Sequence, residues 1–230
     1  MIRKNVVAVI LARKKSKRIP GKNYKNFNGT PVIAITINKL KKSKIFDKII
    51  VSTDSSKIAT IAKKCGAEVP FKRPEFLAND HTSGGPVMAH AIKFLIKKGY
   101  EFENVCCVYA PNPLLQITDL KKGYNKIKSK RFSYVFAATP YVFPFFRSFT
   151  FSQKEGVKMI FYKNYKKRSQ DLKQIMCDAG QFYWGNKNTW LKEKVIFNKN
   201  SDIVIVPKWR YQDLDTLDDW KRAEVISKFI

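Results

Sequence analysis

The chain has 230 residues and a mass of 26.7 kDa, which suits one α/β domain with a sizeable core. Apolar residues make up 44% of it, and this share excludes intrinsic disorder. Its 45 basic and 18 acidic residues give a net charge of +27, which first suggests binding to nucleic acid or to an anionic membrane. The lysines recur along almost every predicted helix, however. We therefore expect a solvated basic surface, neither a membrane nor a nucleic acid as partner, and an anionic small-molecule substrate.

The apolar runs and the cysteines indicate where in the cell the protein resides. The longest runs, such as 6–12 and 135–138, are far shorter than the roughly 20 residues that span a bilayer. Residues 6–12 lead into Arg13-Lys14-Lys15 and not into a small-residue cleavage site, so we expect a cytoplasmic protein. No C-x-x-C spacing occurs. We expect buried thiols, with neither disulfides nor a zinc site, at Cys65, Cys106, Cys107 and Cys177.

Predicted strands and helices alternate along the chain. Runs of β-forming residues predict strands at Val6–Leu11, Lys48–Ser52, 68–71, Asn104–Tyr109 and 134–138. Helical patterns predict one helix that opens at Thr30-Pro31, with Thr30 as its cap, and others at 55–65, 86–98 and 118–130, the last capped by Thr118. Regular order resumes at 180–185, 203–207 and a final helix over 216–230. This alternation predicts a three-layer α/β fold with a mostly parallel sheet covered on both faces.

Residues 139–177, which we call the lobe, interrupt this alternation. The segment begins with two prolines among many phenylalanines and tyrosines, and a Lys/Tyr-rich stretch follows. We expect a β-rich excursion from the sheet. No linker of the kind that separates domains occurs, so 1–230 should form a single domain with the lobe inserted in it.

The loop after the first predicted strand is strongly basic. Six of the thirteen residues from Leu11 to Asn23 are Lys or Arg, and Ser16 and Asn23 add neutral hydrogen-bond donors. Ligands of open parallel sheets bind beyond the carboxyl ends of the strands, where this loop lies. Neither a P-loop nor a G-x-G-x-x-G motif occurs. The loop therefore predicts a polyphosphate site of another kind, with a solvated basic loop as the alternative.

A second candidate site lies near the end of the chain, in Gln212-Asp213-Leu214-Asp215-Thr216. If this segment is extended, Asp213 and Asp215 project to the same side. Two neighbouring carboxylates repel each other unless a cation lies between them, and Mg²⁺ is typically bound by one or two carboxylates plus substrate phosphates. We favour both as metal ligands. The alternative is that Asp215 or Thr216 caps the final helix.

Several strings in a fixed order resemble the cytidylyltransferases that activate nine-carbon acidic sugars as CMP derivatives. They are the basic loop, Lys48–Asp54, Arg73-Pro74-Glu75-Phe76-Leu77-Ala78 and 212–216, and the resemblance covers essentially the whole chain. Three further strings resemble the pseudaminic acid branch, namely 16–19, 168–172 and Asp178-Ala179-Gly180-Gln181-Phe182-Tyr183-Trp184-Gly185. The resemblance implies a Rossmann-like fold of the nucleotide-diphospho-sugar transferase type. It also implies CMP transfer from CTP to the anomeric hydroxyl of the sugar, with release of pyrophosphate and with Mg²⁺ as cofactor.

The resemblance also implies roles for individual residues. CTP would be bound by Leu11, Ala12, Arg13, Ser16, Lys22, Asn23, Arg73, Asp80 and Thr82. The reacting groups would be stabilised by Arg13, Lys17, Lys22, Asp213 and Asp215, of which the two aspartates would carry the metal. The sugar would be bound by Tyr109, Arg147, Arg168, Gln170, Gln181 and Tyr183. The lobe would make a homodimer and lend residues to the sugar site of the neighbouring subunit.

Two departures from the family bear on these expectations. Lys14 and Lys15 stand where many relatives have small residues, so the loop is less free to adopt positive φ. Tyr109 falls where sialic-acid enzymes have Gln, which argues for a differently shaped sugar pocket. Legionaminic, sialic and deoxyoctulosonic acid are the alternative sugars. A non-catalytic protein that binds nucleic acid through its +27 charge is the alternative of another class.

Overall fold

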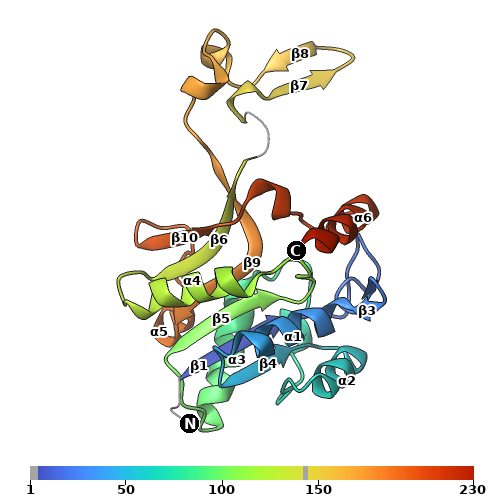
Figure 1. Cartoon of the computed structure of the whole chain (residues 1–230), viewed down its shortest axis with the longest axis vertical. Coiled ribbons are helices and arrows are strands. Elements are labelled where there is room, and N and C mark those ends of the chain that lie inside the picture. The colour runs from blue at the N-terminus through green and yellow to red at the C-terminus, as the bar shows by residue number, and fades with distance from the viewer. Residues whose placement is uncertain (1–4, 142–144) are drawn as a thin grey trace.

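The computed structural model describes residues 5–141 and 145–230 (Figure 1). Six strands form the central sheet in the order β10-β6-β9-β5-β1-β4. Their bounds are β1 Val6–Leu11, β4 Lys48–Ser52, β5 Asn104–Tyr109, β6 Tyr134–Pro140, β9 Met176–Asn186 and β10 Ser201–Ile205. Only β9 runs antiparallel to its neighbours, so the sheet is mostly parallel and the expected fold class is confirmed.

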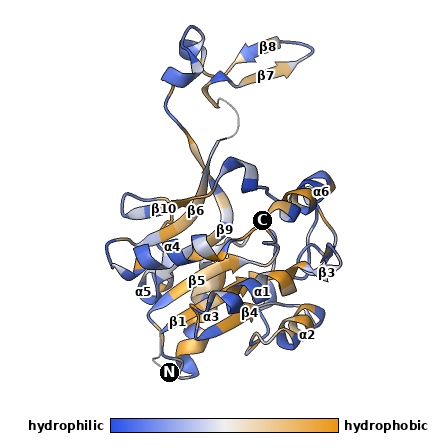
Figure 2. Ribbon diagram, viewed as in Figure 1, coloured by the Kyte–Doolittle hydropathy of each residue, from blue (hydrophilic) through white to orange (hydrophobic). Residues whose placement is uncertain are grey.

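Helices cover both faces of this sheet. On one face lie α1 (Val32–Ser43), α2 (Ser56–Lys64) and α4 (Ile117–Lys128), and on the other lie α3 (Gly84–Lys97) and α5 (Lys187–Leu191). The six residues of β1 are all buried and alternate between the two cores, as the continuous apolar run predicts. Figure 2 shows the apolar strands between helices whose outer faces are polar. The three-layer arrangement is therefore confirmed.

Several predicted boundaries are wrong. Thr30 does not cap α1, because Thr30–Pro31 forms strand β3, which pairs with β2 (Asn26–Phe27), and Pro31 precedes the helix without a side-chain cap. Thr118 lies inside α4, whose first turn follows Gln116. Residues 68–71 form no strand, because only Glu68 makes an isolated bridge to Ile50 of the edge strand β4. The helix expected at 86–98 begins two residues earlier, at Gly84.

A third small core lies beside the sheet and joins distant segments. It contains Ile19 of the basic loop, Leu114 after β5, Leu214 between the two aspartates, and Trp220 of α6 (Leu217–Ile226). Thr216 caps α6, and the side chain of Asp219 returns a hydrogen bond to the backbone of Thr216, so that the two residues form a capping box. This core brings the basic loop and the Asp213–Asp215 segment to the same end of the sheet.

The lobe projects away from the sheet (Figure 1). Its hairpin consists of β7 (Phe149–Ser152) and β8 (Gly156–Met159), its two ends belong to β6 and β9, and the described residues between these strands form 3₁₀ turns and irregular chain. The lobe is thus less rich in strands than expected. Sheet pairing also extends further than expected, because β6 pairs Thr139 with Cys177 of β9. Phe143, one of its aromatic residues, lies outside the described residues.

Two further observations concern the sequence expectations above. All four cysteines are free thiols; Cys106 and Cys107 are buried, whereas Cys65 and Cys177 are only half-buried, contrary to expectation. No helix in the described ranges is long and apolar enough to cross a membrane.

Candidate functional site

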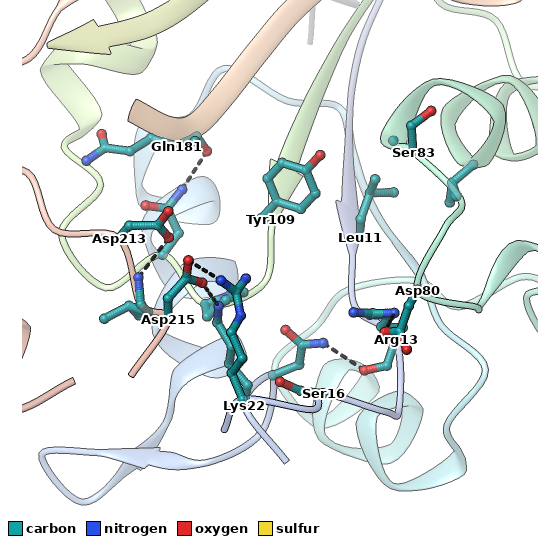
Figure 3. A pocket seen from close by; sticks show the side chains of 18 of the residues that line it. Leu11, Arg13, Ser16, Lys22, Asp80, Ser83, Tyr109, Gln181, Asp213 and Asp215 are labelled. Carbon is teal, nitrogen blue, oxygen red and sulfur yellow. Dashed lines mark hydrogen bonds and ion pairs between the residues drawn. The ribbon is translucent and has the colours of Figure 1, made fainter. Parts of the chain in front are cut away.

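A cleft of about 810 Å³ opens where β1 and β5 end (Figure 3). Its floor comes from Leu11 and Tyr109, the last residues of these strands, and one side comes from the basic loop. The opposite side comes from β9, and the segments after β5 and before α6 complete it. The cleft therefore lies beyond the carboxyl ends of parallel strands, as the doubly wound topology predicts.

The basic loop is shaped by short local contacts. Gly21 adopts φ +66°, and a Cβ there would lie 2.7 Å from the ring of Tyr24, so the turn requires glycine. Asn23 donates from Nδ2 to the carbonyl of Arg13 at 2.7 Å and closes the base of the loop. The backbone N–H of Lys14 donates to Asp54 Oδ1 at 2.7 Å. Neither Lys14 nor Lys15 adopts positive φ, so the loop is formed here without the conformation that favours small residues.

Four cations of this loop contact carboxylates at two separate points. Arg13 and Lys17 both reach Asp80, with nitrogen–oxygen distances of 2.5 and 2.9 Å. These two hydrogen bonds lower the pKa of Asp80. Arg18 and Lys22 both reach Asp215, at 2.5 and 3.3 Å. Figure 3 shows Asp80 and Asp215 apart from each other, with Arg13 beside Asp80 and Lys22 beside Asp215.

Arg73 supplies a further cation and is only 5% exposed. Its guanidinium donates to the hydroxyl and to the carbonyl of Ser52, at 3.0 and 2.6 Å, at the end of β4. Burial lowers its pKa to about 10, so it still carries a positive charge at neutral pH. A fixed cation at this point favours an anionic ligand.

Asp213 and Asp215 face the cleft because Leu214 between them is buried in the third core. Desolvation by the surrounding chain and repulsion by Asp215 raise the pKa of Asp213. No group of three or more His, Cys, Asp or Glu side chains that could hold a metal occurs in the described part of the chain. Two carboxylates beside a cationic loop nevertheless fit Mg²⁺, which draws its other ligands from substrate phosphates and water.

The β9 side of the cleft combines aromatic and polar groups. The ring of Tyr109 packs edge-on against that of Tyr183. The hydroxyl of Tyr183 donates to Asp178 Oδ2 at 2.5 Å, and Asp178 and burial together raise the pKa of Tyr183. Gln181 is 4% exposed, and its Oε1 has no hydrogen-bond partner among the described residues. Asn112 donates to the carbonyl of Gln181 at 2.5 Å, where a β-bulge interrupts the pairing of β6 with β9.

The structure brings most of the expected site residues into this one cleft. Those that line it are Leu11, Arg13, Ser16, Lys17, Lys22, Asn23, Arg73, Asp80, Thr82, Tyr109, Gln181, Tyr183, Asp213 and Asp215. Ala12 is fully buried and does not line the cleft.

Three expected sugar ligands lie in the lobe, outside the cleft of their own chain. Arg147 lines a separate surface pocket and donates to the carbonyl of Lys167, while Arg168 pairs with Asp171 at 2.8 Å. Gln170 is exposed in the same turn as Asp171.

The lining residues that the sequence did not single out as site residues include Arg18, Asn112, Asp178 and Gln212. Asn112 lies three residues after the end of a predicted strand and between two prolines, so its position near a strand end was a usable signal. Asp178 opens the string most specific to the pseudaminic acid branch, but nothing in its spacing distinguishes a ligand from a turn residue.

An α/β sheet with a basic loop after its first strand and two carboxylates facing the same cleft is typical of nucleotide-dependent transferases. The chain belongs to the cytidylyltransferase family, whose model matches residues 7–211. It is 38% identical over 222 residues to a protein of Campylobacter jejuni strain 81-176 described as pseudaminic acid cytidylyltransferase, which covers 96% of each chain. It is also 34% identical over 209 residues to a Helicobacter pylori protein that combines this activity with a hydrolase, and that match covers 90% of this chain and 40% of the other.

Solved structures support the fold. CMP:2-keto-3-deoxy-manno-octonic acid synthetase, complexed with CTP, superposes with a TM-score of 0.71 over 98% of this chain and 99% of its own, at 14% identity. A 4-diphosphocytidyl-2C-methyl-D-erythritol synthase from Anaerococcus prevotii reaches 0.64 over 98% and 99%, also at 14% identity. The expected Rossmann-like transferase fold is therefore confirmed.

Proposed function

We propose that the protein transfers CMP from CTP to the anomeric hydroxyl of pseudaminic acid and releases pyrophosphate. The observation that carries this proposal is that one cleft joins a cationic loop, the carboxylates Asp213 and Asp215, and a β9 side on which Gln181 Oε1 has no partner among the described residues. A pseudaminic acid cytidylyltransferase that is 38% identical over almost the whole length supports the choice of sugar.

The reaction joins two anionic substrates, so catalysis consists mainly of charge neutralisation and positioning. Arg13, Lys17 and Lys22 would stabilise the triphosphate and the departing pyrophosphate. Asn23, Arg73 and Thr82 would lie near the cytosine and the ribose. The hydroxyl of the sugar attacks the α-phosphorus in line, and the bond from this phosphorus to the pyrophosphate oxygen breaks.

Asp213 and Asp215 would hold Mg²⁺. When bound, the ion would supply positive charge at the α-phosphate and acidify the attacking hydroxyl. In its absence Asp215 is engaged by Arg18 and Lys22, and these two cations would turn to phosphate oxygens when Asp215 becomes a metal ligand.

The choice of sugar rests on the β9 side of the cleft. Pseudaminic acid carries a carboxylate and two acylamido groups, so its pocket needs cations, hydrogen-bonding groups and apolar surfaces for the methyl groups. The hydrogen-bonding groups and the apolar surfaces would come from Tyr109, Gln181 and Tyr183. Arg147, Arg168 and Gln170 are too far from their own cleft to line it, and would serve the neighbouring subunit of a homodimer formed through the lobe.

The reaction also bears on location and other partners. We propose that the protein acts in the cytoplasm, where nucleoside triphosphates are made. We propose neither a membrane nor a nucleic acid as its partner. The positive charge would help to attract both anionic substrates.

The test is an assay of pyrophosphate release with CTP, Mg²⁺ and a panel of pseudaminic, legionaminic, sialic and deoxyoctulosonic acid. We expect the highest kcat/KM with pseudaminic acid. Faster turnover of another acid would overturn the choice of sugar, while no turnover together with tight, steeply salt-dependent duplex binding would favour the nucleic-acid alternative.

A further inference from the structure

Asp178 is a carboxylate in a cleft that otherwise attracts anions. Four carboxylates line this cleft among the described residues, and two of them, Asp80 and Asp215, are paired with cations of the basic loop. Asp178 makes no ion pair within the described part of the chain. It is only half-buried, in a protein with a net charge of +27. Its role is therefore not explained by neutralisation of a neighbouring cation.

Two hydrogen bonds orient this carboxylate. Oδ1 accepts from the backbone N–H of Gly180 at 2.9 Å, in a turn where Gly180 adopts φ +60°. Oδ2 accepts from the hydroxyl of Tyr183 at 2.5 Å, and Tyr183 is itself packed against Tyr109 and Phe136. A carboxylate has about four acceptor positions, so these two bonds fix its direction and leave others for a ligand.

The neighbouring residue on β9 adds a second acceptor. Gln181 carries both a carbonyl and an NH₂ group, and its Oε1 has no hydrogen-bond partner among the described residues, on a side chain that is 4% exposed. Asp178 and Gln181 together make this end of the cleft rich in acceptors, whereas the loop at the other side is rich in donors. A buried acceptor without a partner costs free energy, so this end favours a ligand that presents N–H or O–H groups.

We propose that Asp178 selects the acceptor sugar by accepting a hydrogen bond from one of its acylamido N–H groups. The same negative charge repels the carboxylate of the sugar and turns it toward the basic loop, so one residue sets both the chemistry recognised and the direction of binding. Tyr183 acts on the sugar through Asp178 and is a positioning residue in this respect. The inference rests on the proposed function and adds to it a residue that recognises the substituents of the sugar.

Asp178→Asn is the test, because the asparagine oxygen can still accept from the backbone N–H of Gly180. The amide NH₂, which is a donor, then takes the place of Oδ2 beside the Tyr183 hydroxyl, so the substitution removes both the charge and the acceptor on that side. Steady-state kinetics would be measured with each substrate varied in turn. We expect kcat/KM for pseudaminic acid to fall by about ten- to a hundred-fold, the loss typical of a charged hydrogen bond, with KM for CTP unchanged within about twofold. Asp202→Asn, in β10 and outside the cleft, is the matched control for loss of one negative charge and should leave both values unchanged.

Tyr183→Phe provides a second, independent test. It keeps the ring and removes only the hydroxyl that orients Asp178, so we expect a smaller loss in the same direction, in KM for the sugar and not for CTP. Unfolding temperatures of all variants would exclude a general loss of structure as the cause.

The outcomes separate the inference from the function on which it rests. If Asp178→Asn keeps sugar kcat/KM within about twofold of wild type, or loses equally toward CTP and sugar, the inference is wrong even though the enzyme is active. If the wild-type protein prefers another acidic sugar, the choice of pseudaminic acid is wrong, and the same variant is measured with that sugar. If the wild-type protein turns over none of the panel, both are wrong.

Discussion

Arg210 and Asp119 form a buried ion pair, with 2.6 Å between Nη2 and Oδ2 and side chains that are 9% and 3% exposed. The pair ties α4 to the segment that carries Asp213. Beside it, Lys39 of α1 donates to the carbonyls of Pro113 and Leu115, at 2.6 and 2.9 Å, in the segment that carries Asn112. Two sides of the cleft are thus anchored to the same helix layer of the fold.

The first prediction concerns this ion pair. Asp119→Asn should lower the free energy of unfolding by about 3–5 kcal/mol, because it leaves Arg210 buried without its counter-charge. Urea denaturation followed by circular dichroism measures this loss. Asp218→Asn, an exposed carboxylate in the first turn of α6, is the control and should change stability by less than about 0.5 kcal/mol. A loss below about 1 kcal/mol for Asp119→Asn would contradict the assigned role.

The second prediction concerns pH. Burial, together with the charges of Arg210 and Lys42, lowers the pKa of Lys39 from 10.5 to about 8. Between these two values the unfolded chain holds a proton on Lys39 that the folded chain has released, so the contribution of Lys39 to stability rises with pH over this range and is constant below it. Compared with Lys39→Met, the wild-type protein should gain stability from pH 8 to pH 10. Parallel stability curves for the two proteins would show that the pKa of Lys39 is not lowered.

The third prediction concerns the two aspartates of the proposed metal site. Asp213→Asn and Asp215→Asn should each keep the fold and lose more than nine-tenths of kcat, since one carboxylate must then hold Mg²⁺ against water. Binding of Mn²⁺, followed by its paramagnetic effect on water relaxation, should weaken in both variants. A kcat above about a tenth of wild type, roughly 1.4 kcal/mol of barrier, would argue against the assignment.

The fourth prediction concerns the lobe. Phe149 and Phe151 are 60% and 70% exposed on β7, and Tyr162 is 76% exposed nearby. Exposed apolar surface of this kind normally marks an interface, and twofold dimers are the commonest assembly. Light scattering at micromolar concentration should give a dimer for the wild type and a monomer for Phe151→Asp. A wild-type monomer would disprove the dimer.

The fifth prediction concerns the packing of α4 on the sheet. A Cβ at Gly123 would lie 2.7 Å from the ring of Trp184 and 2.9 Å from that of Phe182. Gly123→Ala should therefore destabilise the protein by about 1–3 kcal/mol, despite the better helix propensity of alanine. Gly85→Ala, in the first turn of α3 with nothing within 4 Å, is the matched control and should be neutral or stabilising. Equal unfolding midpoints for the two variants would contradict this contact.

The parallel strands could be predicted because each of them is a local pattern. Val6–Leu11, Lys48–Ser52 and Asn104–Tyr109 are buried apolar runs that alternate with helices, and the structure has all three with the expected bounds. The position of β9 could not be predicted in this way. It is inserted antiparallel between β5 and β6, a pairing decided by tertiary contacts, and its side chains alternate between two cores that only the assembled sheet defines.

The basic loop and the two aspartates were predicted from strand-end and spacing arguments, most other candidate site residues came from the resemblance to a known family, and the rest depended on contacts across the chain. Thr30 does not cap the helix because its backbone pairs with that of Phe27. The preference of threonine for helix N-caps gives no information about such a pairing. Arg18 was not singled out among six basic residues of one loop, because only its contact with Asp215, 197 positions away, distinguishes it. Asp178 needed the turn at Gly180 and the hydroxyl of Tyr183 to become a directed acceptor.

The carboxylates of Asp80 and Asp215 form ion pairs with four cations of the basic loop in the structure without substrate. Nucleotide binding is then an exchange of partners, in which phosphate oxygens displace carboxylate oxygens that are already in place. If the loop binds the triphosphate as proposed, one phosphate would replace one of the two carboxylates, whereas a triphosphate could replace both. We therefore expect inorganic phosphate to be a poor competitor of CTP.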